Sequence, residues 1–123
     1  IAQGLLSGRY GHSNAPGGFR RTNALFIPEN LRRLQPVLDT LQQIARAHRV
    51  EIVQIALAWT IRQTSVAAIP GAKSVWQLEQ NAEAADIELA QHELIALDEV
   101  SRAFRPVSLL RGWQPLLKRL MLK

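Results

Sequence analysis

The residues best suited to chemistry lie in one short segment, AIPGAKSV at positions 68–75. The apolar run at 66–69 is typical of a buried strand, which a Pro-Gly pair then ends. Gly71 would let a ligand come close to the backbone, and Ser74 is a favoured first residue for a following helix. The free N–H groups of a helix start, with Lys73 beside them, suit a phosphate. The segment therefore predicts an anion site, although a purely structural strand-to-helix turn has a similar composition.

The elements around this segment are expected to be mostly helical. Residues 29–48 repeat leucine and isoleucine at spacings of three and four, which predicts a helix with one apolar stripe. Pro36 should break or kink that helix near Gln35, because proline lacks the backbone N–H. Further helices are predicted at about 53–62, 74–84 and 91–104.

Trp59 lies in the second of these helices, which has little polar surface and should be buried. We expect Trp59 to belong to the core and not to a ligand platform. Residues 1–10 are expected to begin as a strand end that turns at Gly4. Residues 11–28 resemble a long loop, of the kind that is usually a functional lid or disordered.

The composition fits one small globular domain. The chain has 123 residues, 47% of them hydrophobic, and no cysteine, which excludes disulfides and thiolate metal sites. No apolar run reaches the roughly 18 residues of a membrane span, and no signal peptide is visible. These features favour a cytoplasmic protein.

The net charge of +5 is concentrated at one end of the chain. Residues 1–103 hold ten Lys or Arg and ten Asp or Glu, whereas residues 104–123 hold five basic residues and no acid. A nucleic-acid-binding surface is therefore a poor explanation of the charge. The sequence at 105–123 predicts a basic amphipathic helix that Pro115 interrupts. We expect this tail to dock on protein in preference to attaching to a membrane surface.

The usual catalytic and metal-binding groups are not assembled. His12, His48 and His92 fall in unrelated local settings, and no His pair has metal-binding spacing. The acids are scattered, so no acid–base pair is evident. The single tyrosine, Tyr10, lies at the edge of the loop. We therefore predict no catalytic residue and no metal site in this chain.

Three separated motifs resemble the C-terminal part of an aldo-keto reductase. They are GLLSGRY at 4–10, IALAWTIR at 55–62 and IPGAKSVWQLEQNAEAADIEL at 69–89. The resemblance implies an α/β protein, a (β/α)8 TIM barrel, of which this chain would supply about strands seven and eight with their helices. Residues 1–104 would be the barrel part and residues 105–123 a separate tail. Because such a barrel needs about 250 residues, the chain is expected to be a fragment.

The resemblance also implies an activity and a cofactor. Such enzymes are oxidoreductases that transfer hydride from NADPH to a small carbonyl substrate, an aldehyde or ketone. Their catalytic Tyr, Lys, Asp and His belong to earlier strands, so Tyr10 does not take the role of the acid and this chain alone should be inactive. The NADP-binding positions carried over from the family are Gly4, Leu5, Ser7 and Arg9 for the pyrophosphate, Gly71, Ala72, Lys73 and Ser74 for the adenosine phosphate, and Gln77, Gln80 and Asn81 for phosphate and adenine.

The sequence is compatible with two functions of different classes. The first is the NADPH-binding end of a carbonyl reductase. The alternative is a non-enzymatic remnant or interaction module that uses its helices and its tail.

Overall fold

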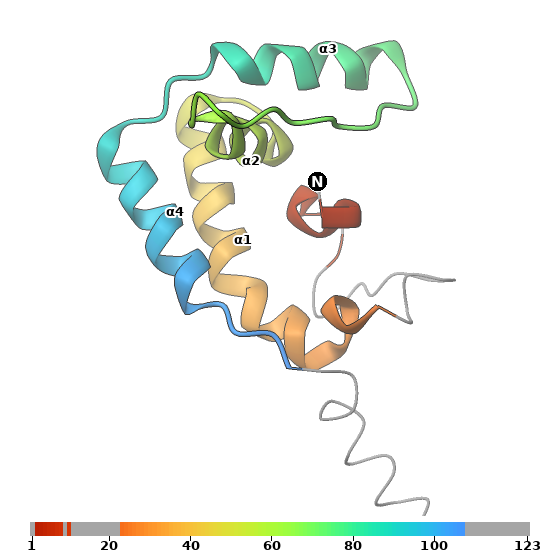
Figure 1. Ribbon diagram of the computed structural model, residues 1–123, viewed down its shortest axis with the longest axis vertical. Coiled ribbons are helices and arrows are strands. Elements are labelled where there is room, and N and C mark those ends of the chain that lie inside the picture. Colours follow the sequence, from red (N-terminus) through yellow and green to blue (C-terminus); the bar gives the residue numbers. More distant parts are fainter. Residues whose placement is uncertain (1, 9, 11–22, 108–123) are drawn as a thin grey trace, which may run out of the picture.

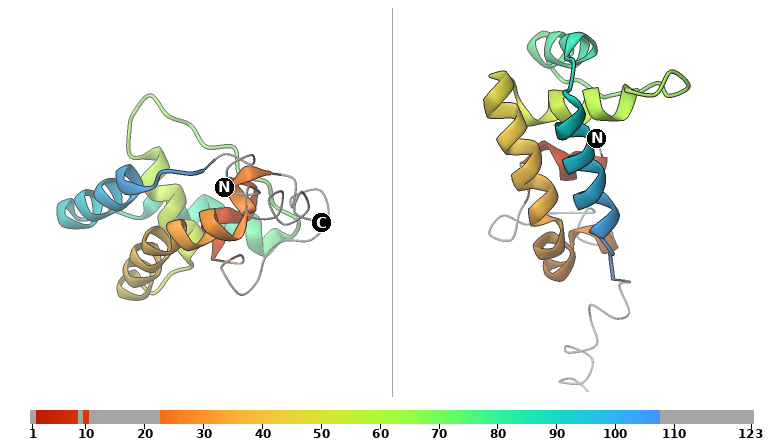
Figure 2. Two further views of the ribbon diagram at one scale, coloured as in Figure 1. Left: turned by 90° about the horizontal axis from the view of Figure 1, so that it is seen from below. Right: turned by 90° about the vertical axis from the view of Figure 1, so that its left-hand side faces the viewer.

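The computed structural model describes residues 2–8, 10 and 23–107. In chain order its elements are the 3-10 helix η1 (Ala2–Ser7), the 3-10 helix η3 (Ala24–Phe26), α1 (Pro28–His48), α2 (Ile52–Ile61), α3 (Val75–Glu83), the 3-10 helix η4 (Ala84–Asp86) and α4 (Gln91–Ala103). Helices α1 and α4 lie side by side and run in opposite directions (Figure 1). Helix α2 packs near the C-terminal end of α1, and α3 lies across the far side of α2 (Figures 1 and 2).

The expected apolar stripe of the first helix is confirmed. It faces α2 and α4, and its buried members are Leu31, Leu34, Leu38, Leu41, Ile44 and Ala45. The expected break near Gln35 is wrong, because α1 continues through Pro36 without interruption. Proline has no N–H to donate to the carbonyl of Arg32, four residues earlier. Pro36 and Arg32 are both exposed, so this lost hydrogen bond lies on the solvent side of α1. The next residue, Val37, is buried and packs α1 on the core.

Helix α2 is the most deeply buried element. Its composition predicts burial on most sides, and Ile55 and Ala56 have no exposed surface. It packs against α1, α3, η1 and η4. Trp59 is half-buried against the core, as expected, although its indole nitrogen also has a polar partner described below.

Two expected strand segments are absent from the described residues. The segment 66–69 forms no ladder, and Ile69 is 99% exposed instead of buried. The first residues form η1 and not a strand end, although the turn at Gly4 is present with φ at +92°. A strand requires a neighbour to complete its hydrogen bonds, and the described residues offer none. The expectation that the chain is mostly helical is confirmed.

One part-buried side-chain hydrogen bond joins the C-terminal end of α1 to the N-terminal end of α4. His48 Nε2 lies 2.9 and 3.0 Å from the two carboxylate oxygens of Glu93. The Ala90 backbone N–H also donates to Glu93, at 2.8 Å, and so closes the first turn of α4. Burial on its own would raise the pKa of Glu93, but the hydrogen bonds from Ala90 and His48 outweigh it and hold that pKa below its usual 4.5.

The segment that follows α4 is fastened to the start of α1 by a buried amide. Asn30 Nδ2 donates to the carbonyls of Ala24 and Val107, and Asn30 Oδ1 accepts from the Val107 N–H at 2.8 Å. Arg33 adds a hydrogen bond to the Arg105 carbonyl. These contacts return the chain to the end of α1 at which η3 also lies.

Some expectations fall outside the described residues. They are residues 11–22 of the loop expected at 11–28, Arg9, and the amphipathic tail from residue 108 onward. The described end of that expected loop is partly helical, because residues 24–26 form η3 and α1 begins at Pro28. Within the part of the chain that the structure describes, no helix has the length and apolar character needed to cross a bilayer.

We predict that Glu93→Gln lowers the free energy of unfolding of the full-length protein at pH 7 by about 1–3 kcal/mol, because it weakens a buried charged hydrogen bond. Since the folded protein holds the Glu93 pKa below 4.5, ionised Glu93 stabilises the fold above that pH. This contribution is lost as the pH falls through the lowered value. Urea unfolding across this range should therefore show the wild type and Glu93→Gln converging in acid.

The matched control is Glu99→Gln, which changes an exposed glutamate of the same helix. It should leave the stability within about 0.5 kcal/mol of the wild type at each pH. A difference between wild type and Glu93→Gln that stays constant from pH 7 into acid would contradict the role given to the carboxylate.

Candidate functional site

The first turn of α3 is built as the sequence predicts. Ser74 is the N-cap, and its Oγ accepts the Gln77 N–H at 3.2 Å. Gln77 reaches back, with its Oε1 accepting the Lys73 N–H at 2.8 Å. No described residue accepts from the N–H groups of Val75 or Trp76. These two donors, at the positive end of the helix dipole, are therefore available to an anion.

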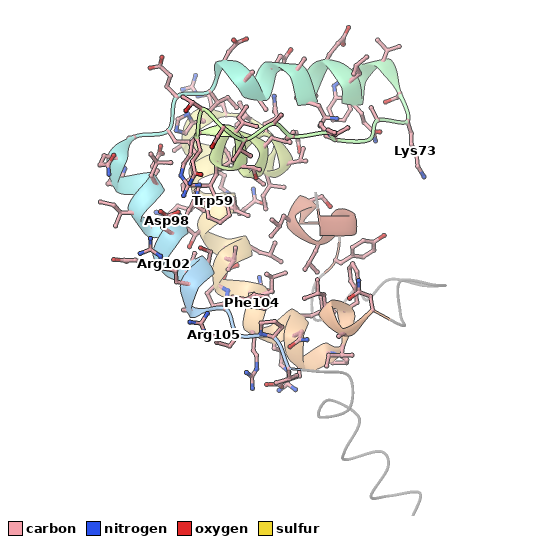
Figure 3. All side chains as sticks on the ribbon, viewed as in Figure 1. Trp59, Lys73, Asp98, Arg102, Phe104 and Arg105 are labelled. Carbon is pink, nitrogen blue, oxygen red and sulfur yellow. The ribbon has the colours of Figure 1, made fainter. Side chains whose placement is uncertain are left out.

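The turn before α3 is exposed along its length. Gly71, Ala72, Lys73 and Ser74 all face solvent. The Lys73 side chain points outward, away from the helical body (Figure 3). A Cβ at Gly71 would meet nothing within 4 Å, so no close contact in the described structure requires glycine there. The turn thus offers a cation and backbone donors on an open surface.

The three amide residues share one face of α3. Gln77, Gln80 and Asn81 are half-buried on the side of the helix that also carries buried Ala84. Gln80 Nε2 donates to Glu83 at 2.9 Å, whereas the side-chain oxygen of Gln77, Oε1, already accepts from the Lys73 backbone N–H. The residues predicted for phosphate and adenine therefore face inward, while the predicted cation faces outward.

Three members of the second predicted group, Gly4, Leu5 and Ser7, lie in η1, which also packs on α2. Ser7 Oγ donates to the Gly4 carbonyl at 2.6 Å, which closes a tight turn. A Cβ on Gly4 would lie 3.1 Å from the ring of Tyr10, so glycine is needed there both for its positive φ and for space. Leu5 is buried in the core, so only its backbone can face a ligand.

The elements that carry the two predicted groups are supported by the same helix. Both η1 and α3 pack on α2, and α3 lies beyond the C-terminal end of α1 (Figure 1). Tyr10 packs edge-on against Phe26, with ring centroids 5.6 Å apart. Among the described residues, no three His, Cys, Asp or Glu side chains gather in a way that would hold a metal ion.

A polar cluster that the sequence did not predict lies at the end of α2. Asp98 Oδ1 accepts from Trp59 Nε1 at 2.9 Å and from Arg62 at 2.7 Å, and the Arg62 guanidinium lies 5.3 Å from the Trp59 ring centre. Figure 3 shows Trp59, Asp98 and Arg102 gathered beside α4, well away from Lys73. The cluster fixes the point from which the 63–74 connection begins. Trp59 and Arg62 are close in the sequence, but only the tertiary fold brings Asp98 to them, so sequence spacing gave no signal for the cluster.

Comparisons with known proteins agree on one family. A sequence model described as the Aldo/keto reductase family matches residues 1–102. The uncharacterized oxidoreductase Rv2298 of Mycobacterium tuberculosis H37Rv is 56% identical over 108 residues, which cover 88% of this chain and 33% of that protein.

More distant relatives carry more specific names. Aldo-keto reductase str7 of Strobilurus tenacellus is 33% identical over 82% of this chain and 31% of its own length. The NADH-specific methylglyoxal reductase of Escherichia coli K12 is 29% identical over 84% of this chain and 32% of its own length. The chain thus spans about a third of the length of the curated relatives it matches.

Proposed function

The chain belongs to the aldo/keto reductase family, and we propose that it forms the dinucleotide-binding end of an NADPH-dependent reductase of aldehydes or ketones. The family implies a (β/α)8 barrel, and in such barrels phosphate is often bound after strands seven and eight. In this proposal the chain supplies the turn at 71–74 and helix α3 to that site, and the remaining barrel supplies the catalytic groups.

The observation that carries the proposal is the N-terminus of α3. Ser74 and Gln77 hold its first turn in a fixed shape, and the Val75 and Trp76 N–H groups have no acceptor among the described residues. Lys73 adds a full positive charge directly before the helix. A helix start with an adjacent cation is well suited to a phosphate monoester.

The preference for NADPH follows from the charge of Lys73. NADPH differs from NADH by a phosphate on the adenosine ribose, so a cation at that position favours NADPH. The related enzyme of Escherichia coli is named NADH-specific, and family membership alone therefore leaves the choice between the cofactors to experiment. The bound cofactor would supply the hydride for the carbonyl carbon.

Exposed apolar side chains at residues 69–78 support a larger barrel around this part of the chain. Ile69 is 99% exposed, and Val75, Trp76 and Leu78 of α3 are also largely uncovered. In our proposal the segment around Ile69 pairs as a barrel strand, which buries Ile69, and other parts of the barrel cover the apolar side chains of α3.

The same exposed apolar side chains also suit the alternative of an interaction module without reductase activity. The two functions differ in one readout, the oxidation of NADPH by small aldehydes and ketones in the presence of the full-length protein. Carbonyl-dependent oxidation supports the reductase. Nucleotide-independent binding of another protein, with no such oxidation, supports the interaction module.

We predict that Lys73→Glu raises the Kd for NADPH about 10- to 100-fold, because it replaces an attractive charge with a repulsive one. The Kd for NADH, which lacks the extra phosphate, should change by less than about threefold. Fluorescence titration of the full-length protein with each nucleotide measures both values.

The control for Lys73→Glu is Arg46→Glu, which makes the same charge reversal at an exposed position of α1. It should leave both affinities unchanged. An NADPH affinity that Lys73→Glu does not alter would remove Lys73 from the proposed site.

We also predict that Ile69→Asp destabilises the full-length protein by about 3–5 kcal/mol, because a barrel strand would bury the new carboxylate without a partner. Ile95→Asp, at a position of α4 that is 49% exposed, should cost far less. Thermal or urea unfolding compares the two. Equal, small effects of both variants would show that Ile69 remains in solvent and would count against the barrel.

A further inference from the structure

The last residue of α3, Glu83, carries a charge that its position in the helix disfavours. A carboxylate at a helix C-terminus faces the negative end of the helix dipole. Its position is explained by two hydrogen bonds to the same oxygen. Glu83 Oε2 accepts from Gln80 Nε2 at 2.9 Å and from Gln54 Nε2 at 3.3 Å.

The bond from Gln54 ties α3 to the start of α2. Gln54 is 2% exposed, and its Oε1 already accepts the Glu51 N–H at 2.9 Å. Its amide nitrogen therefore needs an acceptor, since a buried donor without one costs free energy. Glu83 provides that acceptor from the neighbouring helix.

The hydrogen bond from Gln80 to Glu83 has a different effect. Gln80 and Glu83 lie three residues apart on the same helix, so their contact does not join α3 to another element. It does fix the Gln80 carboxamide, because the nitrogen is held by Glu83. Among the described residues nothing donates to Gln80 Oε1, so the oxygen is the free end of the amide.

We propose that Glu83 is a positioning residue, which holds the Gln80 carboxamide so that its oxygen is presented to an N–H donor of the bound nucleotide. Glu83 itself does not touch the ligand. Without it the amide rotates freely, and half of its orientations present an NH₂ group to the same donor. This inference rests on the proposed function, because it concerns how the nucleotide site is organised.

A double-mutant cycle on the full-length protein tests this role, with the Kd for NADPH as the readout. Glu83→Ala should raise that Kd about five- to tenfold, the equivalent of about one hydrogen bond. Glu83→Gln keeps an acceptor oxygen and should restore the affinity to within about twofold. In a Gln80→Ala background, Glu83→Ala should change the Kd by less than about twofold, because there is no amide left to position.

Asp86→Ala is the matched control, since it removes an exposed negative charge three residues further along the chain. It should leave the Kd for NADPH unchanged. If Glu83→Ala does not fold, the cycle is repeated in a Gln54→Met background, where no buried amide is left without an acceptor.

The outcomes separate the inference from the proposed function. Wild-type protein that shows no saturable NADPH binding overturns both. NADPH binding with no effect of Glu83→Ala, or with an equal effect in the Gln80→Ala background, overturns the positioning role alone. An equal effect of Asp86→Ala would assign the loss of affinity to charge and would also overturn the positioning role.

Discussion

Burial of helix α2 is the constraint on which the other described elements depend. Its sequence, IVQIALAWTI, leaves almost no polar surface for water, and α1, α3, η1 and η4 all pack on it. Two polar side chains of α2 find their partners in other helices. Near its start Gln54 donates to Glu83, and near its end Trp59 donates to Asp98. Each carboxylate belongs to a different helix, so α2 is joined to α3 near one end and to α4 near the other.

This arrangement positions the candidate site. The connection 63–74 leaves the end of α2 that Asp98 holds, and α3 returns to the other end through Glu83. The N-terminus of α3, with its two uncommitted backbone donors, is thereby supported while its surroundings stay open. The candidate site is thus built from a capped helix start and an exposed turn.

Local patterns predicted the helices well because their causes are local. The stripe of α1, the burial of α2 and the Ser74 cap of α3 follow from residues a few positions apart. The strand expected at 66–69 did not form, since a strand depends on partners distant in the sequence. The predicted break at Pro36 failed for a related reason, because packing of α1 on the core outweighs one lost hydrogen bond.

The roles of Asp98 and Glu83 could not be predicted from spacing. Their partners Trp59 and Gln54 lie 39 and 29 residues away. On the sequence both acids belong to the scattered exposed carboxylates. The placement of Glu83 at a helix end that disfavours acids was the one local signal, and it required the helix boundary to be known.

The central claim is that the nucleotide phosphate binds at the start of α3, and hydrogen exchange of the full-length protein with and without NADPH tests it most directly. We predict that NADPH slows exchange of the amides at 73–77, and that it does so more strongly than NADH at equal saturation. Saturating NADPH that leaves these amides unprotected, while protecting others, would contradict the claim.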